Sequence, residues 1–420
     1  MRLKVLISAY ACSPYQGSEF GVGWGFVAAL ARDHDLWVIV EEEKCRADLE
    51  RYLAEHPAFG QRVRFYFLHK QRNRWLRKLW PPSYYWYYRR WHQDAYQLAQ
   101  QLHQEIGFDL AHQLTMVGFR EPGYLWQLGI PFVWGPVGGM GRFPWRFLPT
   151  VGLYGAIYYL GYNLFNALHS QFLNRPKRAA QAAGDGLIAM NEENHRGLLK
   201  YYRASNKICI PVGPPSVVSD TVVPKAHEEP LRIVWTGLHI PRKALNLGLE
   251  ALAQLPDDVA WELHILGKGM CTATWERLAT SLGIDGHCYF HGWLPREQAL
   301  KVMKSSHLML FTSLREGTPS VLTEAFSLAL PVICFDWSGM ADMVNETCGI
   351  KVPVTTPKAV IAGLAQAIEQ LARNEDQRQA LAQGALVRAR DFAWEEKAQV
   401  VTAIYHVKVL RNPGIDAGKP

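Results

Sequence analysis

Cysteine is scarce in this sequence and is never arranged in a pair that could hold a metal. The 420 residues include seven cysteines, an odd number, and none of them forms a CxxC pair. This pattern argues against a disulfide framework and against a structural zinc site. We therefore expect reduced thiols in a cytoplasmic protein.

The sequence also lacks an apolar run that is suited to crossing a membrane. The apolar stretch at residues 5–12 is too short for a signal peptide, and we interpret it as a first buried strand. Residues 147–174 carry no Asp, Glu, Lys or Arg and are numerous enough to span a bilayer. Pro149 and two asparagines interrupt this run, so we expect an interfacial or crevice-lining helix.

Size and charge indicate a two-domain globular chain with an anionic ligand. The residues are 49% hydrophobic and the formal net charge is +7. A chain of this length usually forms two domains, and this charge suits anionic ligands or an acidic membrane surface without indicating nucleic acid. We predict a first domain at residues 1–210, a Pro- and Val-rich linker at 211–230, a second domain at 231–395, and a C-terminal helix and tail at 396–420.

Short apolar segments alternate with helical patterns along most of the chain. Such alternation predicts an α/β architecture with parallel sheets. The expected strands lie at residues 3–9, 36–40, 108–112, 131–139 (with a Gly-rich loop), 184–190, 207–210, 231–236, 261–266, 288–291, 307–312 and 332–335. The expected helices lie at residues 22–32, 192–202, 244–254, about 275–282, 295–305 and 391–411.

The stretch 307–335 combines a strand, a polar loop, a helix and a second strand. Thr318 suits the N-cap of the helix and Pro319 its first position, where a missing N–H costs nothing. The amides of Ser320 and Val321 would then point from the positive end of the helix into the crevice above the sheet. This arrangement predicts an anion-binding site.

Two glutamates frame the predicted anion site, Glu316 in the loop and Glu324 two turns into the helix. A carboxylate beside an anion is unfavourable unless the ligand also carries hydroxyl groups. A nucleotide sugar has both parts, because its diphosphate suits the helix terminus and its hydroxyls can donate to the carboxylates. Taken alone, the pair is also compatible with a surface loop followed by an ordinary amphipathic helix.

A basic loop after the expected strand 231–236 is the second chemical motif. Arg242 and Lys243 stand where the next helix begins. Positive charge at that end opposes the helix dipole unless an anion is bound, so the loop is typical of a phosphate clamp.

A glycine-rich loop follows the first expected strand and contains Gly17, Gly21 and Gly23. Glycines let the backbone approach a phosphate or a sugar closely. With Glu41 at the end of the second strand, they imitate a dinucleotide-binding fingerprint, so an NAD-dependent oxidoreductase is an alternative function. We rank it second, because the glycines come long after the strand and the full GxGxxG spacing is absent.

Carboxylates that could bind a divalent metal are not clustered in the sequence. Asp33 and Asp35 form a DxD pattern, yet they lie in a helix-to-strand turn, where Asp is common, and we interpret them as structural. No other group of carboxylates is typical of a magnesium site. We therefore expect no metal and no other cofactor.

Residues 70–91 have the most unusual composition in the chain, with seven Lys or Arg, eight aromatic residues and no acid. Basic residues interleaved with Trp and Tyr suit a membrane interface with anionic lipid headgroups. Nucleic acid could use the same chemistry, but no RNA- or DNA-binding module surrounds the segment. We predict peripheral membrane or acceptor contact, with a partly buried linker as the alternative.

The pair Glu316 and Glu324, with seven residues between them, resembles the paired-glutamate motif of the retaining glycosyltransferases of family four, the group 1 glycosyl transferases. The Thr-Pro-Ser cap and the run EAFSLALPVI that flank the pair are similar as well. The resemblance covers nearly the whole chain and is strongest over residues 231–400. It implies the GT-B fold, with two Rossmann-like doubly wound α/β domains facing across a cleft and a C-terminal helix crossing back to the first domain.

The resemblance also implies roles for particular residues. Glu316 would hold sugar hydroxyls near the developing positive charge, and Glu324 would hold the hydroxyls of the ribose. His112, or failing it Gln113, would orient the sugar from the first domain. The other donor-binding residues would be Lys243, Arg242, Gly237, Gly317, Pro319, Ser320, Val321 and Gly339, and those of the N-terminal loop would be Gly17, Gly21 and Gly23.

One position departs from the pattern of the family. The family normally has an arginine just after the glycine of the basic loop, and this chain has Leu238 there. Arg242 or His239 would have to compensate. A relative that binds nucleotide sugars without catalysing transfer is therefore a further alternative.

These features together predict a retaining, metal-independent glycosyltransferase of the hexosyltransferase type. It would move a sugar from a UDP- or GDP-sugar to a saccharide or lipid-linked acceptor in cell-surface polysaccharide or glycolipid synthesis. Fixed cations would stabilise the diphosphate leaving group. We expect it in the cytoplasm, peripheral on the inner face of the cytoplasmic membrane, with no nucleic-acid partner.

Overall fold

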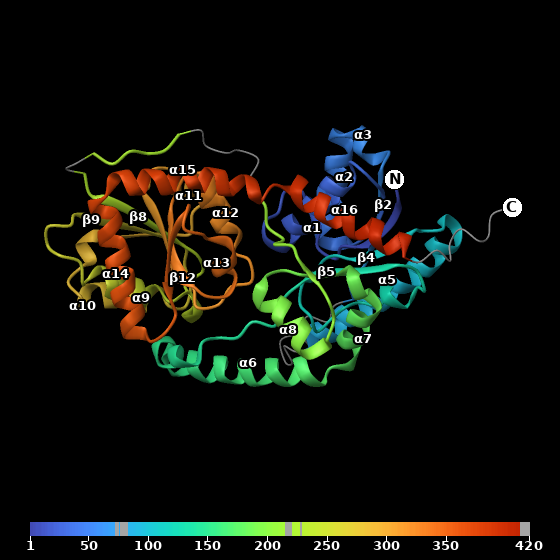
Figure 1. Cartoon of the computed structure of the whole chain (residues 1–420), viewed down its shortest axis with the longest axis horizontal. Coiled ribbons are helices and arrows are strands. Elements are labelled where there is room, and N and C mark those ends of the chain that lie inside the picture. Colours follow the sequence, from blue (N-terminus) through green and yellow to red (C-terminus); the bar gives the residue numbers. More distant parts are fainter. Residues whose placement is uncertain (72–74, 76–82, 215–220, 227–228, 412–420) are drawn as a thin grey trace. The chain divides into compact units, whose positions relative to one another are not determined.

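The computed structural model describes residues 1–71, 75, 83–214, 221–226 and 229–411, and Figure 1 shows its helices and strands. The residues group by their packing into two compact units. Unit 1 consists of Met1–Met140, Leu168–Pro211 and Trp394–Pro420, and unit 2 consists of Gly141–Ala167 and Val212–Ala393. Unit 1 therefore differs from the predicted first domain, 1–210, because residues 141–167 pack within unit 2.

Unit 1 is built on a seven-stranded parallel sheet with the order β3-β2-β1-β4-β5-β6-β7. Its strands are β1 (Lys4–Ser8), β2 (Asp35–Glu41), β3 (Val63–Leu68), β4 (Leu110–Gln113), β5 (Phe132–Val137), β6 (Leu187–Ala189) and β7 (Lys207–Ile208). The central strands are almost entirely buried, as expected for a parallel sheet with helices on both faces. The predicted parallel α/β architecture is confirmed, although β3 was not predicted.

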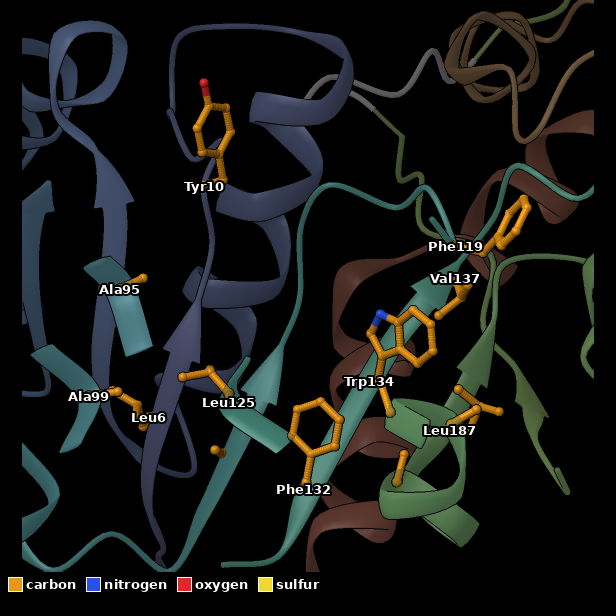
Figure 2. Packing of buried hydrophobic residues seen from close by; sticks show 14 of the residues in the cluster. Leu6, Tyr10, Ala95, Ala99, Phe119, Leu125, Phe132, Trp134, Val137 and Leu187 are labelled. Carbon is orange, nitrogen blue, oxygen red and sulfur yellow. The ribbon is translucent and has the colours of Figure 1, made fainter. Parts of the chain in front are cut away.

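Helices cover the sheet of unit 1 and close its core. They are α1 (Ser18–Leu30), α2 (Glu42–Glu55), α3 (Pro57–Gly60), α5 (Ser83–Ile106), the end of α6 (Gly152–Phe172), α7 (Asn174–Ala183), α8 (Glu192–Tyr202) and α16 (Trp394–Leu410), with the short 3-10 turns η1 (Leu125–Gln127) and η3 (Gly184–Gly186). Figure 2 shows part of the buried cluster, in which Leu6 of β1, Trp134 of β5 and Ala99 of α5 take part.

Unit 2 is built on a six-stranded parallel sheet with the order β10-β9-β8-β11-β12-β13. Its strands are β8 (Leu231–Thr236), β9 (Trp261–Leu266), β10 (Cys288–Gly292), β11 (Leu308–Phe311), β12 (Val332–Asp336) and β13 (Gly349–Pro353). Its helical segments are η2 (Trp145–Val151), most of α6, η4 (Pro241–Lys243), α9 (Leu245–Leu252), α10 (Thr272–Ser281), η5 (Asp285–His287), α11 (Arg296–Lys304), α12 (Ser320–Ser327), α13 (Ser338–Met343), α14 (Pro357–Arg373) and α15 (Glu375–Asp391). The strands alternate with helices, which produces the predicted parallel sheet.

The C-terminal helix α16 packs against α1 within unit 1, so the predicted return of this helix to the first domain is confirmed. Gly25 of α1 lies against the indole of Trp394, and a β-carbon at Gly25 would come within 2.3 Å of a ring atom. The ring of Phe26 also contacts this indole, with 5.4 Å between the centroids. The two helices can approach this closely because position 25 has no side chain.

Helix α1 begins at Ser18, whereas the sequence predicted a start at residue 22. Gly17 is its N-cap, and Gly21 and Gly23 lie inside the helix, so the predicted glycine-rich loop is shorter than expected. A β-carbon on Gly23 would lie 2.0 Å from the carbonyl oxygen of Ala11, so this glycine permits close packing of the helix on the preceding chain. A dinucleotide fingerprint needs its first glycines in the turn itself, and the donor-side role of these residues stays a prediction.

The basic and aromatic segment 70–91 is described only in part, since residues 72–74 and 76–82 lie outside the described residues. In the described part, Tyr85 and Trp86 are exposed on α5, whereas Tyr88 and Trp91 are buried in the core of unit 1. Over the described ranges, none of the helices combines the length and the hydropathy needed to cross a bilayer.

Candidate functional site

The two chemical motifs of unit 2 lie side by side because their strands are neighbours. β8 pairs with β11, so the loops at the carboxyl ends of these strands meet at one edge of the sheet. The N–H of Leu314 donates to the carbonyl of Arg242 at 2.8 Å. The hydroxyl of Thr312 donates to the carbonyl of Lys243, also at 2.8 Å. These bonds fix the basic turn η4 against the loop that carries Glu316.

Glu316 is held by two cations and one hydroxyl. Its Oε1 lies 2.8 Å from Nζ of Lys243 and accepts a 2.8 Å hydrogen bond from the hydroxyl of Ser313. The guanidinium of Arg242 donates to the same oxygen, and also to the carbonyl of Arg315 at 2.8 Å. The exposed fraction of the side chain is 13% for Glu316, 12% for Lys243 and 25% for Arg242. Two cations against one carboxylate leave one positive charge in excess at a largely buried site.

The electrostatics of this cluster favour the ionised form of Glu316. Burial raises the pKa of Glu316, but the charges of Lys243 and Arg242 and the hydrogen bonds to the carboxylate outweigh this and hold the pKa below its ordinary value. Burial lowers the pKa of Lys243, and Glu316 partly offsets this effect. In the described ranges, no group of three His, Cys, Asp or Glu is placed to hold a metal ion.

Helix α12 begins close to this cluster. Pro319 is its N-cap, with an extended backbone, so the helix starts one residue later than the prediction that made Thr318 the cap. The N–H of Leu322 bonds back to the carbonyl of Pro319 at 3.1 Å. The N–H groups of Ser320 and Val321 precede this bond and therefore lie at the positive end of the helix, where an anion would be stabilised.

Glycines let the neighbouring loops approach the cluster. The N–H of Gly339 donates to the carbonyl of Glu316 at 3.1 Å, and a β-carbon there would lie 1.7 Å from the carbonyl oxygen of Gly317. A β-carbon on Gly237 would lie 3.4 Å from Cε of Lys243. The structure thus brings these three glycines next to Glu316 or Lys243, and their contact with a donor stays a prediction.

Glu324 is engaged by a cation that the sequence analysis did not single out. Its Oε1 accepts a 2.8 Å hydrogen bond from Nη2 of Arg296 on α11. Arg296 is 65% exposed, so the pair is screened by water and its net contribution is small, about 0–1 kcal/mol. The carboxylate of Glu324 can therefore exchange this partner for ligand hydroxyls at little cost.

Of the two residues predicted to compensate for Leu238, the structure places only Arg242 at the cluster. His239 is 1% exposed, lies among aromatic rings, and its Nδ1 is 2.8 Å from the hydroxyl of Thr272. Burial lowers the pKa of His239 to about 4, so the ring is neutral at neutral pH. Leu238 itself is half exposed and brings no charge.

His112 lies in the interior of unit 1, on β4. Its Nδ1 is 2.6 Å from the hydroxyl of Tyr405, and its Nε2 is 2.8 Å from the carbonyl oxygen of Gly135. Burial lowers the pKa of His112 to about 4, so the ring is neutral. The fallback residue, Gln113, is also buried and donates to the carbonyl of Thr115 at 3.1 Å. A contact between His112 and a sugar stays a prediction, since both of its ring nitrogens bond to protein atoms.

Arg315 and Tyr162, beside the cluster, are among the residues that the sequence analysis missed. The guanidinium of Arg315 lies 3.9 Å from the ring centroid of Tyr162 and bonds to its hydroxyl. The position of Arg315 next to Glu316 was a usable signal. Tyr162 is 153 residues away on α6, and no local pattern marks it.

Part of the chain is similar to a known family of proteins. Residues 222–387 match the family described as Glycosyl transferases group 1. The lipopolysaccharide 1,6-galactosyltransferase of Salmonella typhimurium is 27% identical over 165 residues, which is 37% of this chain and 44% of that protein. The D-inositol 3-phosphate glycosyltransferase of Xylanimonas cellulosilytica is 26% identical over 254 residues, 55% of this chain and 59% of that protein. The chain thus spans about half the length of these relatives.

Solved structures match over nearly the whole chain. The structure of Anabaena HepE in complex with UDP and glucose matches with a TM-score of 0.59 at 14% identity, and covers 97% of this chain and 100% of that one. At this identity the likeness concerns the fold alone. The chain has the GT-B fold that its sequence resemblance implied.

Proposed function

We propose that this chain, whose residues 222–387 match the group 1 glycosyl transferases, moves a sugar from a nucleoside diphosphate sugar to an acceptor hydroxyl and keeps the anomeric configuration. The observation that carries the proposal is the buried cluster in which Lys243 and Arg242 surround Glu316 close to the start of α12. The excess positive charge and the helix terminus both suit a diphosphate. The carboxylate suits the hydroxyls of a sugar.

The chemical difficulty in this reaction is charge separation, because the diphosphate gains negative charge while the sugar becomes cation-like. Fixed donors aimed at the leaving group lower that barrier. Lys243, Arg242 and the first amides of α12 would fill this role, so we propose transfer without a metal. Glu316 would hold sugar hydroxyls and lie near the developing positive charge. Glu324 would hold the ribose hydroxyls in place of Arg296.

The relatives support a choice of donor and acceptor class. HepE was solved with UDP and glucose, and one relative is named for a galactosyl transfer in lipopolysaccharide. We therefore propose a UDP-sugar as the donor, ahead of a GDP-sugar. We propose a saccharide or lipid-linked acceptor in cell-surface polysaccharide or glycolipid synthesis.

The test is the release of UDP or GDP by the full chain over a panel of donor sugars, with a lipid-linked saccharide as the acceptor. We expect release with at least one donor, unchanged by EDTA. Glu316→Ala should abolish it, and Glu346→Ala, which removes an exposed glutamate of the same unit, should not. Turnover by Glu316→Ala at the wild-type rate would count decisively against the assignment.

Leu238 favours one second candidate, a relative that binds nucleotide sugars without transferring them. In that case the chain would bind UDP in calorimetry, and none of the donors would be turned over. Leu238→Arg then separates the two functions. If it creates turnover in an inactive chain, the second candidate is correct for the wild type.

A further inference from the structure

Helix α6 carries its polar residues inward and its apolar residues outward. Tyr159, Asn163, Asn166 and Ser170 are buried on its inner face. The large apolar and aromatic residues of the outer face, between 42% and 81% exposed, are Leu153, Tyr154, Ile157, Tyr158, Leu160, Leu164, Phe165, Leu168 and Phe172. A surface helix of a protein in water normally has the opposite arrangement. An exposed apolar face of this extent marks an interaction site.

Hydrogen bonds on the inner face hold the helix in this orientation. The side-chain amide of Asn163 accepts from the N–H of Phe143 and donates to its carbonyl, both at 2.9 Å. The amide of Asn166 donates to the carbonyl of Gly141 at 3.0 Å. Turning the helix to bury its apolar face would break these buried bonds, and each unpaired buried polar group costs about 1–3 kcal/mol. The outward apolar face is therefore part of the fold.

The charges around α6 are mostly positive. From residue 122 to residue 184 the sequence has no Asp or Glu and has five Lys or Arg. Arg146 before the helix, and Lys177 and Arg178 after it, are exposed. At the C-terminal end of α6, an open pocket is lined by Gln171 with the cations Lys177, Lys200 and Arg203 and the single acid Asp185. Such surroundings complement negatively charged groups.

We propose that the outer face of α6 docks on a lipid bilayer with anionic headgroups, with the helix lying in the interface. The helix, which is labelled in Figure 1, is about 30 Å long. Its outer face bears leucines, phenylalanines and tyrosines but no charge. Apolar side chains would enter the acyl boundary, the tyrosines would lie at headgroup depth, and the flanking cations would contact phosphates. This surface is formed by other residues than the segment 70–91, and the proposal does not depend on the proposed function.

A second copy of the chain fits this face less well than a bilayer. In a two-fold dimer the same patch meets itself. Exposed cations flank both ends of α6, so parallel and antiparallel pairing of two helices each bring like charges together, which opposes association. Anionic headgroups, by contrast, attract cations of this kind.

The experiment is co-sedimentation of the full chain with two kinds of vesicle, phosphatidylcholine alone and phosphatidylcholine mixed with phosphatidylglycerol. The apolar variant combines Ile157→Gln, Leu164→Gln and Phe165→Gln, all at exposed positions. The charge variant combines Lys177→Glu and Arg178→Glu. A matched control combines three exposed apolar residues elsewhere: Met270→Gln, Val387→Gln and Val400→Gln. Thermal melting shows that each variant is folded.

The wild type should bind the mixed vesicles more tightly than phosphatidylcholine alone, and added salt should weaken that binding. The apolar variant should bind at least about tenfold more weakly to the mixed vesicles, because three large apolar groups no longer enter the bilayer. The charge variant should lose the preference for phosphatidylglycerol, and the control should bind like the wild type. Wild-type binding by the apolar variant, or no vesicle binding at all, would overturn the proposal. A wild-type dimer in sedimentation equilibrium that the apolar variant dissociates would replace it with self-association.

Discussion

Replacing Glu316 by Gln removes the negative charge from a site that keeps two cations, Lys243 and Arg242, which are 12% and 25% exposed. Breaking a buried charge pair by removing one partner costs about 3–5 kcal/mol. Gln keeps the shape and the hydrogen bond from Ser313, and Arg242 reaches some water, so we expect roughly 2–3 kcal/mol. In a unit of this size, that corresponds to a melting temperature lower by roughly 5–10 °C.

The same change should strengthen the binding of UDP. In the wild type, a diphosphate must share Lys243 and Arg242 with the carboxylate, whereas in Glu316→Gln both cations can turn to the ligand. We expect UDP to bind about tenfold more tightly, which is a gain of about 1.4 kcal/mol, while sugar transfer is lost. Isothermal titration calorimetry with UDP measures the first effect, and UDP release from a donor sugar measures the second.

The control is Ser313→Ala, which removes a hydrogen bond to Glu316 but leaves the three charges. It should bind UDP like the wild type. Weaker or unchanged binding of UDP by Glu316→Gln would show that the two cations do not hold the diphosphate, and the reasoning from the charge cluster would fail.

Three further predictions concern stability. The pKa of Glu316 is depressed in the folded chain, so its ion pairs contribute fully to the stability of the fold above pH 4.5. This contribution is lost as the pH falls through the depressed pKa. The free energies of unfolding of the wild type and Glu316→Gln, measured in urea, should therefore converge in acid. Burial lowers the pKa of Lys397 to about 8. Lys397→Met should therefore raise the free energy of unfolding at pH 7 by roughly 2 kcal/mol, and it should abolish the rise in stability that the wild type shows between pH 8 and 10.5. An unchanged pH profile of stability would contradict this. Gly25→Ala should cost about 1–3 kcal/mol in urea unfolding, because its β-carbon meets the indole of Trp394. Adding Trp394→Leu should recover part of the stability lost in Gly25→Ala. If it recovers none, the contact with Trp394 is not the source of the strain.

Regular elements could be predicted wherever the local pattern was sufficient. The strands at residues 231–236 and 261–266 and the helix at 192–202 have the predicted bounds, because short apolar runs and a capped amphipathic pattern are visible in the sequence itself. The start of α1 could not be predicted. Its glycines let the carbonyl of Ala11 and the indole of Trp394 approach the helix closely, and Trp394 comes from a distant part of the chain.

The members of the charge cluster could be predicted one by one, but their contact could not. A basic turn at a helix start marks Arg242 and Lys243, and a polar loop before a helix marks Glu316. They meet only because β8 and β11 are adjacent in the sheet, although β9 and β10 lie between them in the sequence. His112 shows the opposite case, since its partner Tyr405 is 293 residues away and nothing near His112 indicates that it is enclosed.

The return of α16 to unit 1 has a consequence for how the chain matures. Unit 1 contains β1, formed by residues 4–8, and it is closed by a helix that starts at residue 394. During synthesis the ribosome releases almost all of unit 2 before it releases α16. The second unit can therefore fold while the surface of α1 around Gly25 is not yet covered by Trp394. Chaperones that shield exposed apolar surface would therefore be needed longest by the half of the protein that is translated first.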